Sequence, residues 1–148
     1  MVDIARKTKG ITPLMHATAA QLVAGCPEKD DVCEASTLHA FVRDNIRYVG
    51  DIRNVETIKF PDQTLNLGYG DCDDKALLLA ALAEAINFST RFCAVGLNGE
   101  TYSHVLPQIL IRGRGWTSAE VIPIDDAGTR APFGWFPPDA TCLMVAHV

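Results

Sequence analysis

The chain has 148 residues, of which 48% are hydrophobic and 21% are charged, and its net charge is −5. This composition is typical of a soluble globular protein, and the length predicts one domain over residues 1–148 with a sizeable core. The acidic balance disfavours a nucleic-acid partner, and the longest apolar run is far shorter than the roughly 20 residues of a membrane span.

Five cysteines, an odd number without a Cys-x-x-Cys pair, argue against a zinc ribbon and against a full disulfide framework. The first residues lack the apolar segment of a secretion signal, so reduced thiols are expected. Cys26 and Cys33 flank a polar turn and could pair in an oxidising setting, but we expect them to stay unpaired. Cys93 and Cys142 lie in apolar, strand-like stretches and are predicted to be small core residues.

Two helices are predicted in the first third of the chain. The first covers Leu14–Ala24 and ends at Gly25. The second covers Glu34–Tyr48, where apolar residues follow the 3.6-residue period. Residues 49–66 then form a long connection without clear periodicity, and connections of that length often wrap a functional site.

The chain is organised around residues 67–86, a glycine-containing loop followed by a run of strong helix formers. Asp71 can cap the helix with its side chain, and Asp74 stands three residues later, as in a capping box. The stretch Ala76–Ala83 is apolar without a break, so the helix has no polar face through its middle. We therefore expect it to be buried between other layers.

Cys72 falls in the first turn of this helix. Unpaired N–H groups and the positive end of the helix dipole stabilise a thiolate there, so we expect a reactive cysteine. Asp71, Asp73 and Asp74 resemble a metal-binding cluster at first sight. Consecutive side chains at a helix start diverge, however, and capping already explains two of them, so no metal is expected.

Strands dominate the second half of the chain. Asn98-Gly99 is a typical hairpin turn between the first two strands, and turn signals separate the others. The predicted strands are Thr90–Leu97, Tyr102–Ile111 and Trp116–Ile124, and Thr141–Val148 could close the sheet. Helices followed by an antiparallel meander make the fold class α+β.

A reactive cysteine needs a base, and that base needs an orienting group. His104 lies on the second predicted strand and Glu120 on the third, within cross-strand reach of each other. Asp125 and Asp126 are alternatives for the orienting role. The other histidines are expected to be structural: His16, His39 and His147.

An ordered set of motifs resembles the transglutaminase-like superfamily, which shares the papain-like cysteine-peptidase fold. The set begins with Gly70-Asp-Cys-Asp-Asp-Lys-Ala76 and continues with Arg91-Phe92, His104-Val105 and Gly115-Trp116, the last four residues before an acid. The resemblance covers roughly residues 35–124. It implies N-terminal helices and a central buried helix packed on an antiparallel sheet.

The resemblance also implies roles for three residues: Cys72 as nucleophile, His104 as general base and acid, and Glu120 as the orienting acid. The family usually has Asp at that last position. Gln63 is a weak candidate for an oxyanion donor, and the backbone N–H of Cys72 is the better one. Trp116 is expected to cover the sheet, with some prospect of walling the site, and Pro132–Pro138 is expected to be a surface loop that could form a rim or docking patch.

The stretches Ile46-Arg-Tyr48, Phe60–Leu65 and Gly-Asp-Cys-Asp-Asp look most like the short members of the family in bacteriophages and prophages. That likeness implies a place in the cytoplasm of a bacterial host or in a virion, with phage structural proteins as candidate partners.

The expected reaction is acyl transfer at an amide through a Cys72 thioester, without a cofactor, on a peptide or protein substrate. Hydrolysis of a peptide, isopeptide or other amide bond is the first expectation. A true transglutaminase, which joins an amine to a glutamine side chain, shares every step up to the thioester. The third reading is a non-catalytic assembly module of a phage particle.

Overall fold

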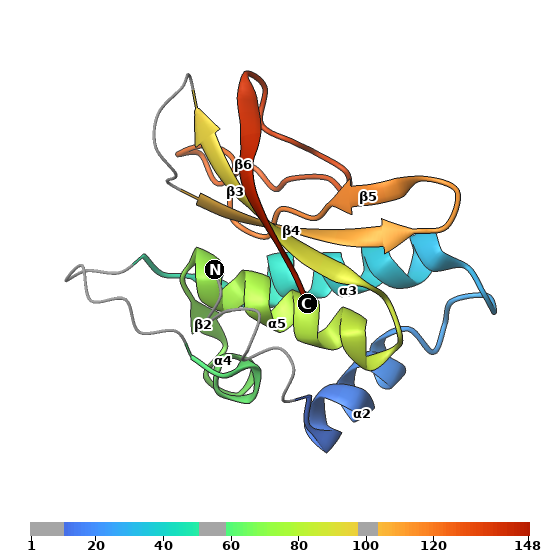
Figure 1. Cartoon of the computed structure of the whole chain (residues 1–148). Coiled ribbons are helices and arrows are strands. Elements are labelled where there is room, and N and C mark those ends of the chain that lie inside the picture. Colours follow the sequence, from blue (N-terminus) through green and yellow to red (C-terminus); the bar gives the residue numbers. More distant parts are fainter. Residues whose placement is uncertain (1–10, 51–58, 98–103) are drawn as a thin grey trace.

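The computed structural model describes residues 11–50, 59–97 and 104–148, and its fold is α+β as predicted (Figure 1). The helices of these residues are α2 (Pro13–Leu22), α3 (Asp31–Asn45), α4 (Pro61–Leu67) and α5 (Cys72–Ala85). The strands of the main antiparallel sheet are β3 (Thr90–Leu97), β4 (His104–Ile111), β5 (Gly115–Ser118) and β6 (Ala140–His147). Their order in the sheet is β5-β4-β3-β6.

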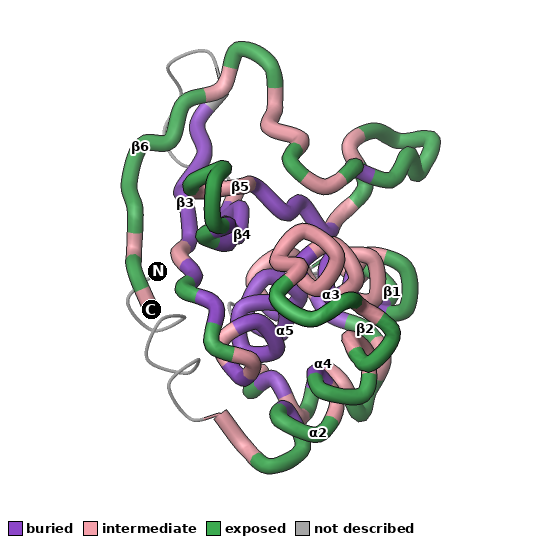
Figure 2. The backbone as a smooth tube through the Cα atoms, turned by 90° about the vertical axis from the view of Figure 1, so that its right-hand side faces the viewer, coloured by how far each residue is buried: buried purple, intermediate pink, exposed green. Residues whose placement is uncertain are grey.

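The central helix α5 is buried, as the sequence predicted, and Figure 2 shows it surrounded by the other elements. Every residue from Asp74 to Ala83 is buried, because α2, α3 and α4 contact the helix as well as β4 of the sheet. Leu78 and Leu82 join the core on the helical side, while Leu77 packs against Phe92 of the sheet. None of the helices in the described residues is long and apolar enough to span a membrane.

The start of α5 has the predicted capping box. The Asp71 carboxylate accepts the Asp74 N–H at 2.9 Å, and the Asp74 carboxylate accepts the Asp71 N–H at 3.2 Å. Gly70 lies against this box, since a Cβ atom there would stand 2.6 Å from Cβ of Asp74. The loop before Cys72 is therefore packed tightly onto the first turn of the helix.

The connection predicted over residues 49–66 is more structured than its sequence indicated. It contains α4, and two short strands, β1 (Arg47–Tyr48) and β2 (Tyr69–Gly70), pair in parallel on either side of it. Helix α3 ends at Asn45, earlier than predicted, because Ile46 is already extended toward β1. The pairing of β1 with β2 joins residues that are more than 20 positions apart, so it leaves no periodic pattern in the local sequence. Residues 51–58 of this connection lie outside the described ones.

The sheet follows the predicted order, with two differences. β6 pairs with β3 and lies at one edge of the sheet. The predicted Asn98-Gly99 turn lies outside the described residues. β5 ends at Ser118 instead of continuing to Ile124. Ala119 still donates to the Pro107 carbonyl at 2.9 Å, but Pro107 has no N–H with which to return the bond, so the ladder stops.

The expectation of reduced thiols is wrong for four cysteines, and Cys142 is exposed, whereas Cys93 is a buried core residue as predicted. Cys26 and Cys33 form a disulfide across the polar turn, and Cys93 and Cys142 form another between β3 and β6. The apolar neighbours of the second pair gave no sign of a bond, but β3 and β6 pair with a register shift between Ala94 and Val95, and the Cα atoms of the two cysteines lie 5.5 Å apart. Cys72 is the one free cysteine of the five, and all five are described.

Candidate active site

Cys72 and His104 lie at the same end of the molecule. Each begins its element, and α5 and β4 run in the same direction where they pack together (Figure 1). The backbone of Val105, the neighbour of His104, is close enough to the Cys72 thiol to lower the pKa of the thiol. The fold thus brings His104, at the first position of β4, to the same end of the molecule as the thiol.

His104 forms a hydrogen bond with Glu120, as the sequence predicted, between Nε2 and Oε2 at 2.6 Å. The other carboxylate oxygen of Glu120 accepts the N–H groups of Val121 at 3.0 Å and Ile122 at 3.3 Å. A carboxylate only accepts, so Nε2 carries the hydrogen and the neutral imidazole keeps its lone pair on Nδ1. Nδ1 is then the atom of His104 that can take a proton.

Glu120 lies in the irregular segment that follows β5, and not on a regular strand. Its backbone carbonyl accepts a hydrogen bond from Nε2 of His39 in α3 at 2.6 Å, and its side chain is 3% exposed. His39 is buried, and burial lowers the pKa of its imidazole, whereas the hydrogen bond to the Glu120 carbonyl opposes that shift. His39 has a structural role, as expected, and that role is to anchor the backbone of Glu120.

The two alternative acids do not approach His104 in this way. The exposed Asp125 carboxylate accepts from the Thr129 amide at 3.1 Å and the Thr129 hydroxyl at 2.7 Å, which closes its own turn. Asp126 is also exposed. The carboxylate that accepts a hydrogen bond from the His104 ring is that of Glu120.

The expectation of a stabilised thiolate at Cys72 is wrong for this structure. Burial raises the pKa of the thiol to about 12, and the charges of Asp73 and Asp71 add to the shift. The backbone of Val105 opposes this rise in pKa, and the thiol itself donates to Oδ1 of Asp73 at 3.7 Å. The helix dipole does favour an anion here, but three carboxylates crowd the same helix start. Cys72 is therefore a neutral thiol near pH 7.

The same crowding affects Asp71, whose pKa rises to about 6 because the side chain is half-buried and lies beside Asp74 and Asp73. Asp71 and Asp74 hold each other in the capping box, and Asp74 also accepts from the Lys59 amide and ammonium.

Within the described ranges, no group of three or more His, Cys, Asp or Glu side chains is arranged to hold a metal ion.

The comparisons with known proteins agree with this geometry. Residues 16–121 match the transglutaminase-like superfamily. The chain belongs to this superfamily. No curated protein matches the sequence significantly. Family membership, together with the fold, supports a cysteine-dependent enzyme in general terms.

Two solved structures share the fold of this transglutaminase-like domain. One is a proposed protease from Parabacteroides distasonis, with a TM-score of 0.63, 13% identity and 91% of this chain covered. The other is a proposed cysteine protease from Cytophaga hutchinsonii, with a TM-score of 0.57, 14% identity and 91% covered. This chain spans only 30% and 48% of the length of those two proteins. At such identities the likeness concerns the fold.

Sequence reasoning missed two side chains near the transglutaminase-like site. Lys75 is 1% exposed one turn after Cys72, and its Nζ donates to the Arg43 carbonyl at 3.4 Å. Burial lowers the pKa of Lys75 to about 8, although the charge of Glu120 favours its protonated form. A charged residue leading directly into an apolar run was the available signal for it.

Tyr48 is the second missed side chain. The β1–β2 pair places it opposite Gly70, and burial together with the charges of Cys72, Asp71 and Glu120 raises the pKa of its phenol. No role was predicted for Tyr48 because its strand pairing joins residues that are far apart in the chain.

Two other candidates have structural roles. Gln63 accepts the Phe60 N–H at 3.0 Å and so caps α4. Trp116 stacks on the Arg91 guanidinium, 4.6 Å from the ring centroid, and contacts His147 edge-on. Trp116 thus covers the sheet, as expected.

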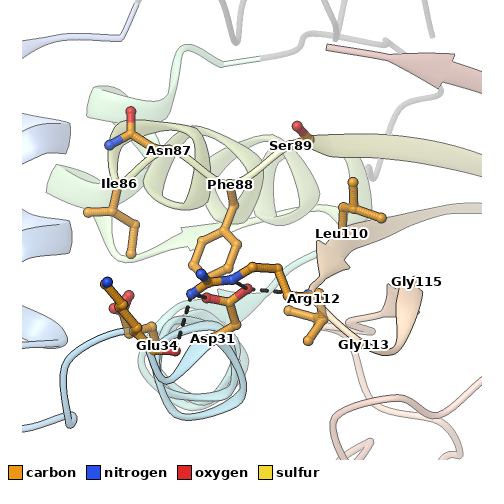
Figure 3. A pocket seen from close by; sticks show the side chains of 12 residues that line it. Asp31, Glu34, Ile86, Asn87, Phe88, Ser89, Leu110, Arg112, Gly113 and Gly115 are labelled. Atoms are coloured by element: carbon orange, nitrogen blue, oxygen red, sulfur yellow. Dashed lines mark hydrogen bonds and ion pairs between the residues drawn. The ribbon is translucent and has the colours of Figure 1, made fainter.

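Two hollows differ in what lines them. The one that we call the His104 hollow has a volume of about 350 Å³ and includes His104 and Glu120. The larger one, about 690 Å³, lies at the far end of α5, where Arg112 bonds Asp31 at 2.6 Å (Figure 3). Neither a cysteine nor a histidine is among the described residues that line this larger hollow, whereas His104 and Glu120 line the smaller one.

Proposed function

We propose that this transglutaminase-like protein is a cysteine hydrolase that cleaves a peptide, isopeptide or other amide bond, with Cys72 as nucleophile, His104 as base and acid, and Glu120 as orienting acid. The observation that carries the proposal is the 2.6 Å hydrogen bond between His104 and Glu120, at the start of the strand that packs against the helix beginning with Cys72. It fixes Nε2 as the donor and leaves Nδ1 for proton transfer.

In the first half of the reaction, Nδ1 of His104 takes the thiol proton while Sγ of Cys72 attacks the carbonyl carbon. The C–N bond then breaks, His104 gives that proton to the leaving nitrogen, and the acyl group remains on Sγ as a thioester. The backbone N–H of Cys72, at the start of α5, is the candidate donor to the oxyanion. Because the thiol is neutral, proton transfer accompanies the attack instead of preceding it.

In the second half, water gives a proton to His104 and its oxygen attacks the thioester carbon. The C–S bond breaks, the acid is released, and the sulfur recovers its proton from His104. An amine in place of water would give transamidation by the same steps, so the products decide between hydrolysis and transglutamination.

A non-catalytic role is the second candidate, and one observation favours it. The pKa of the thiol is raised to about 12, the reverse of the usual tuning of a catalytic cysteine. A transglutaminase-like domain with a quiescent thiol would fit an assembly module, for which phage structural proteins are the partners suggested by the sequence.

The test is to incubate the protein with a peptide library digested from a bacterial proteome and to identify new peptide ends and adducts on Cys72 by mass spectrometry. A glutamine peptide with an added amine, analysed for loss of ammonia, reports transamidation. Wild type should produce new ends, whereas Cys72→Ala and His104→Ala should produce none. Folded wild type that yields neither products nor a Cys72 adduct would favour the assembly module.

A further inference from the structure

The His104 hollow is lined mainly by carbon atoms although it lies beside the most polar contact of the site. Val95 is buried at its base next to His104 and Glu120. Its walls come from the segment after β5 and from the loop before β6: Ile122, Pro123, Ile124, Trp135, Pro137 and Pro138. A small apolar hollow with a few polar groups at one end is the usual form of a ligand pocket, for which about 300–1,000 Å³ is typical.

The loop that carries Trp135 is anchored from both sides. Gly134, with a φ of 94°, donates its N–H to the Ser118 carbonyl at 2.7 Å, at the end of β5. Phe136 packs on the buried side chains of Val95 and Leu106. Prolines then stiffen the chain before β6 begins. The wall is thus formed before any ligand arrives, so binding requires little ordering of the protein.

The position of the hollow relative to the thiol decides which part of a substrate it can receive. Cys72 is not among the described residues that line it, whereas His104 and Glu120 are. A separate hollow of about 450 Å³, also lined by Ile122–Ile124, includes Tyr48, which pairs with Gly70 two residues before Cys72. In the proposed reaction the acyl group bonds to the thiol and the leaving nitrogen receives its proton from His104.

From this arrangement we infer that the His104 hollow binds an apolar side chain, aliphatic or aromatic, on the residue that supplies the leaving nitrogen. This inference rests on the proposed function. The family match ends at residue 121, so most of the wall comes from sequence beyond it. An apolar pocket that separates side chains by a few methylene groups gives roughly 10–200-fold discrimination.

The first experiment uses the same peptide library. Cleavage should favour sites followed by Leu, Ile, Met or Phe by at least about tenfold in kcat/KM over sites followed by Gly, Ser or Asn. Trp135→Ala should remove most of that preference while retaining cleavage of the polar sites. Trp116→Phe is the matched control, because Trp116 contacts Arg91 and His147 on the sheet, and it should keep the preference.

A second experiment needs no activity. Leucine amide, a mimic of the released amine, is titrated into the Cys72→Ala, Trp116→Phe protein, in which Trp135 is the remaining tryptophan. We expect saturable quenching of Trp135 fluorescence with a dissociation constant at least tenfold lower than that of serine amide. Ile124→Asp should abolish the difference, and circular dichroism will report whether that variant is folded.

The outcomes are distinct for the two proposals. Cleavage without a preference after the cut bond, a preference that Trp135→Ala retains, or equal binding of both amides overturns the inference and leaves the hydrolase proposal standing. Tight binding of leucine amide to a protein that cleaves nothing supports the apolar pocket and removes the proposed reaction.

Discussion

The two halves of the site are built in opposite ways. Around His104 and Glu120 the polar groups are hydrogen-bonded, since each oxygen of the buried Glu120 carboxylate accepts at least one hydrogen bond. Around Cys72, carboxylates of like charge crowd a buried helix start and oppose the thiolate that the helix dipole would favour.

This difference indicates where catalytic power should reside. A thiol with a pKa of about 12 contributes little nucleophile by itself near pH 7, so a reaction depends on the base that removes its proton. That base is useful only while its ring is held with Nδ1 free. We therefore expect His104 and Glu120 to control the turnover rate. The carboxylates around Cys72, which we call the acidic half, should control how fast the thiol reacts with reagents such as iodoacetamide.

The largest effect should come from Glu120→Gln. The amide can donate as well as accept, so it no longer fixes the tautomer of His104, and acylation of Cys72 by the best library peptide should slow by about 10²–10⁴-fold. The measurement is the rate of adduct formation by mass spectrometry. Asp125→Asn is the control and should match wild type, because Asp125 bonds only within its own turn to Thr129. A normal rate in Glu120→Gln beside a slow Asp125→Asn would shift the orienting role downstream.

Lys75 provides a test by pH. Its pKa falls from 10.5 to about 8 on folding, so the folded protein binds fewer protons than the unfolded chain between those values. The free energy of unfolding should therefore rise from pH 8 to 10.5, by at most about 3 kcal/mol. Lys75→Met should abolish the rise. Urea unfolding should be measured in a Cys72→Ala background, because the raised thiol pKa acts in the opposite direction above pH 9.0. An identical rise in both proteins would mean that Lys75 is not the source.

Gly70→Ala should destabilise the start of α5. The added Cβ would stand 2.6 Å from Cβ of Asp74, so the loop or the first helical turn must move, at a cost of about 1–3 kcal/mol. Gly25→Ala is the matched control, since no atom lies within 4 Å of its Cβ position, and it should stay within about 0.5 kcal/mol of wild type. Equal midpoints of thermal unfolding for the two variants would contradict the tight packing of this loop.

The smallest effect concerns the acidic half itself. Asp73→Asn removes the nearest like charge and should lower the pKa of the Cys72 thiol, so alkylation by iodoacetamide at pH 7.5 should become about threefold to tenfold faster. The four other cysteines are in disulfides, so the label reports on Cys72 alone. Asp125→Asn serves again as the control. Slower alkylation of Asp73→Asn would mean that Asp73 activates the thiol instead of suppressing it.

Local rules explain what the sequence predicted well. The capping box of Asp71 and Asp74 spans three residues, and the apolar run that buries α5 is continuous, so neither depends on the rest of the fold. The contact between His104 and Glu120 was predicted because a short turn separates the two strands, although the regular strand assumed for Glu120 ends at Ser118.

Tertiary structure decided the features that join distant parts of the chain. The disulfide of Cys93 links residues 49 positions apart, and the contact of His39 with Glu120 links residues 81 positions apart. The pKa of Cys72 was also beyond sequence reasoning, because burial sets it and depends on every element packed around α5. A sequence pattern records periodicity and spacing along the chain, whereas desolvation and strand pairing depend on distances that exist only after folding.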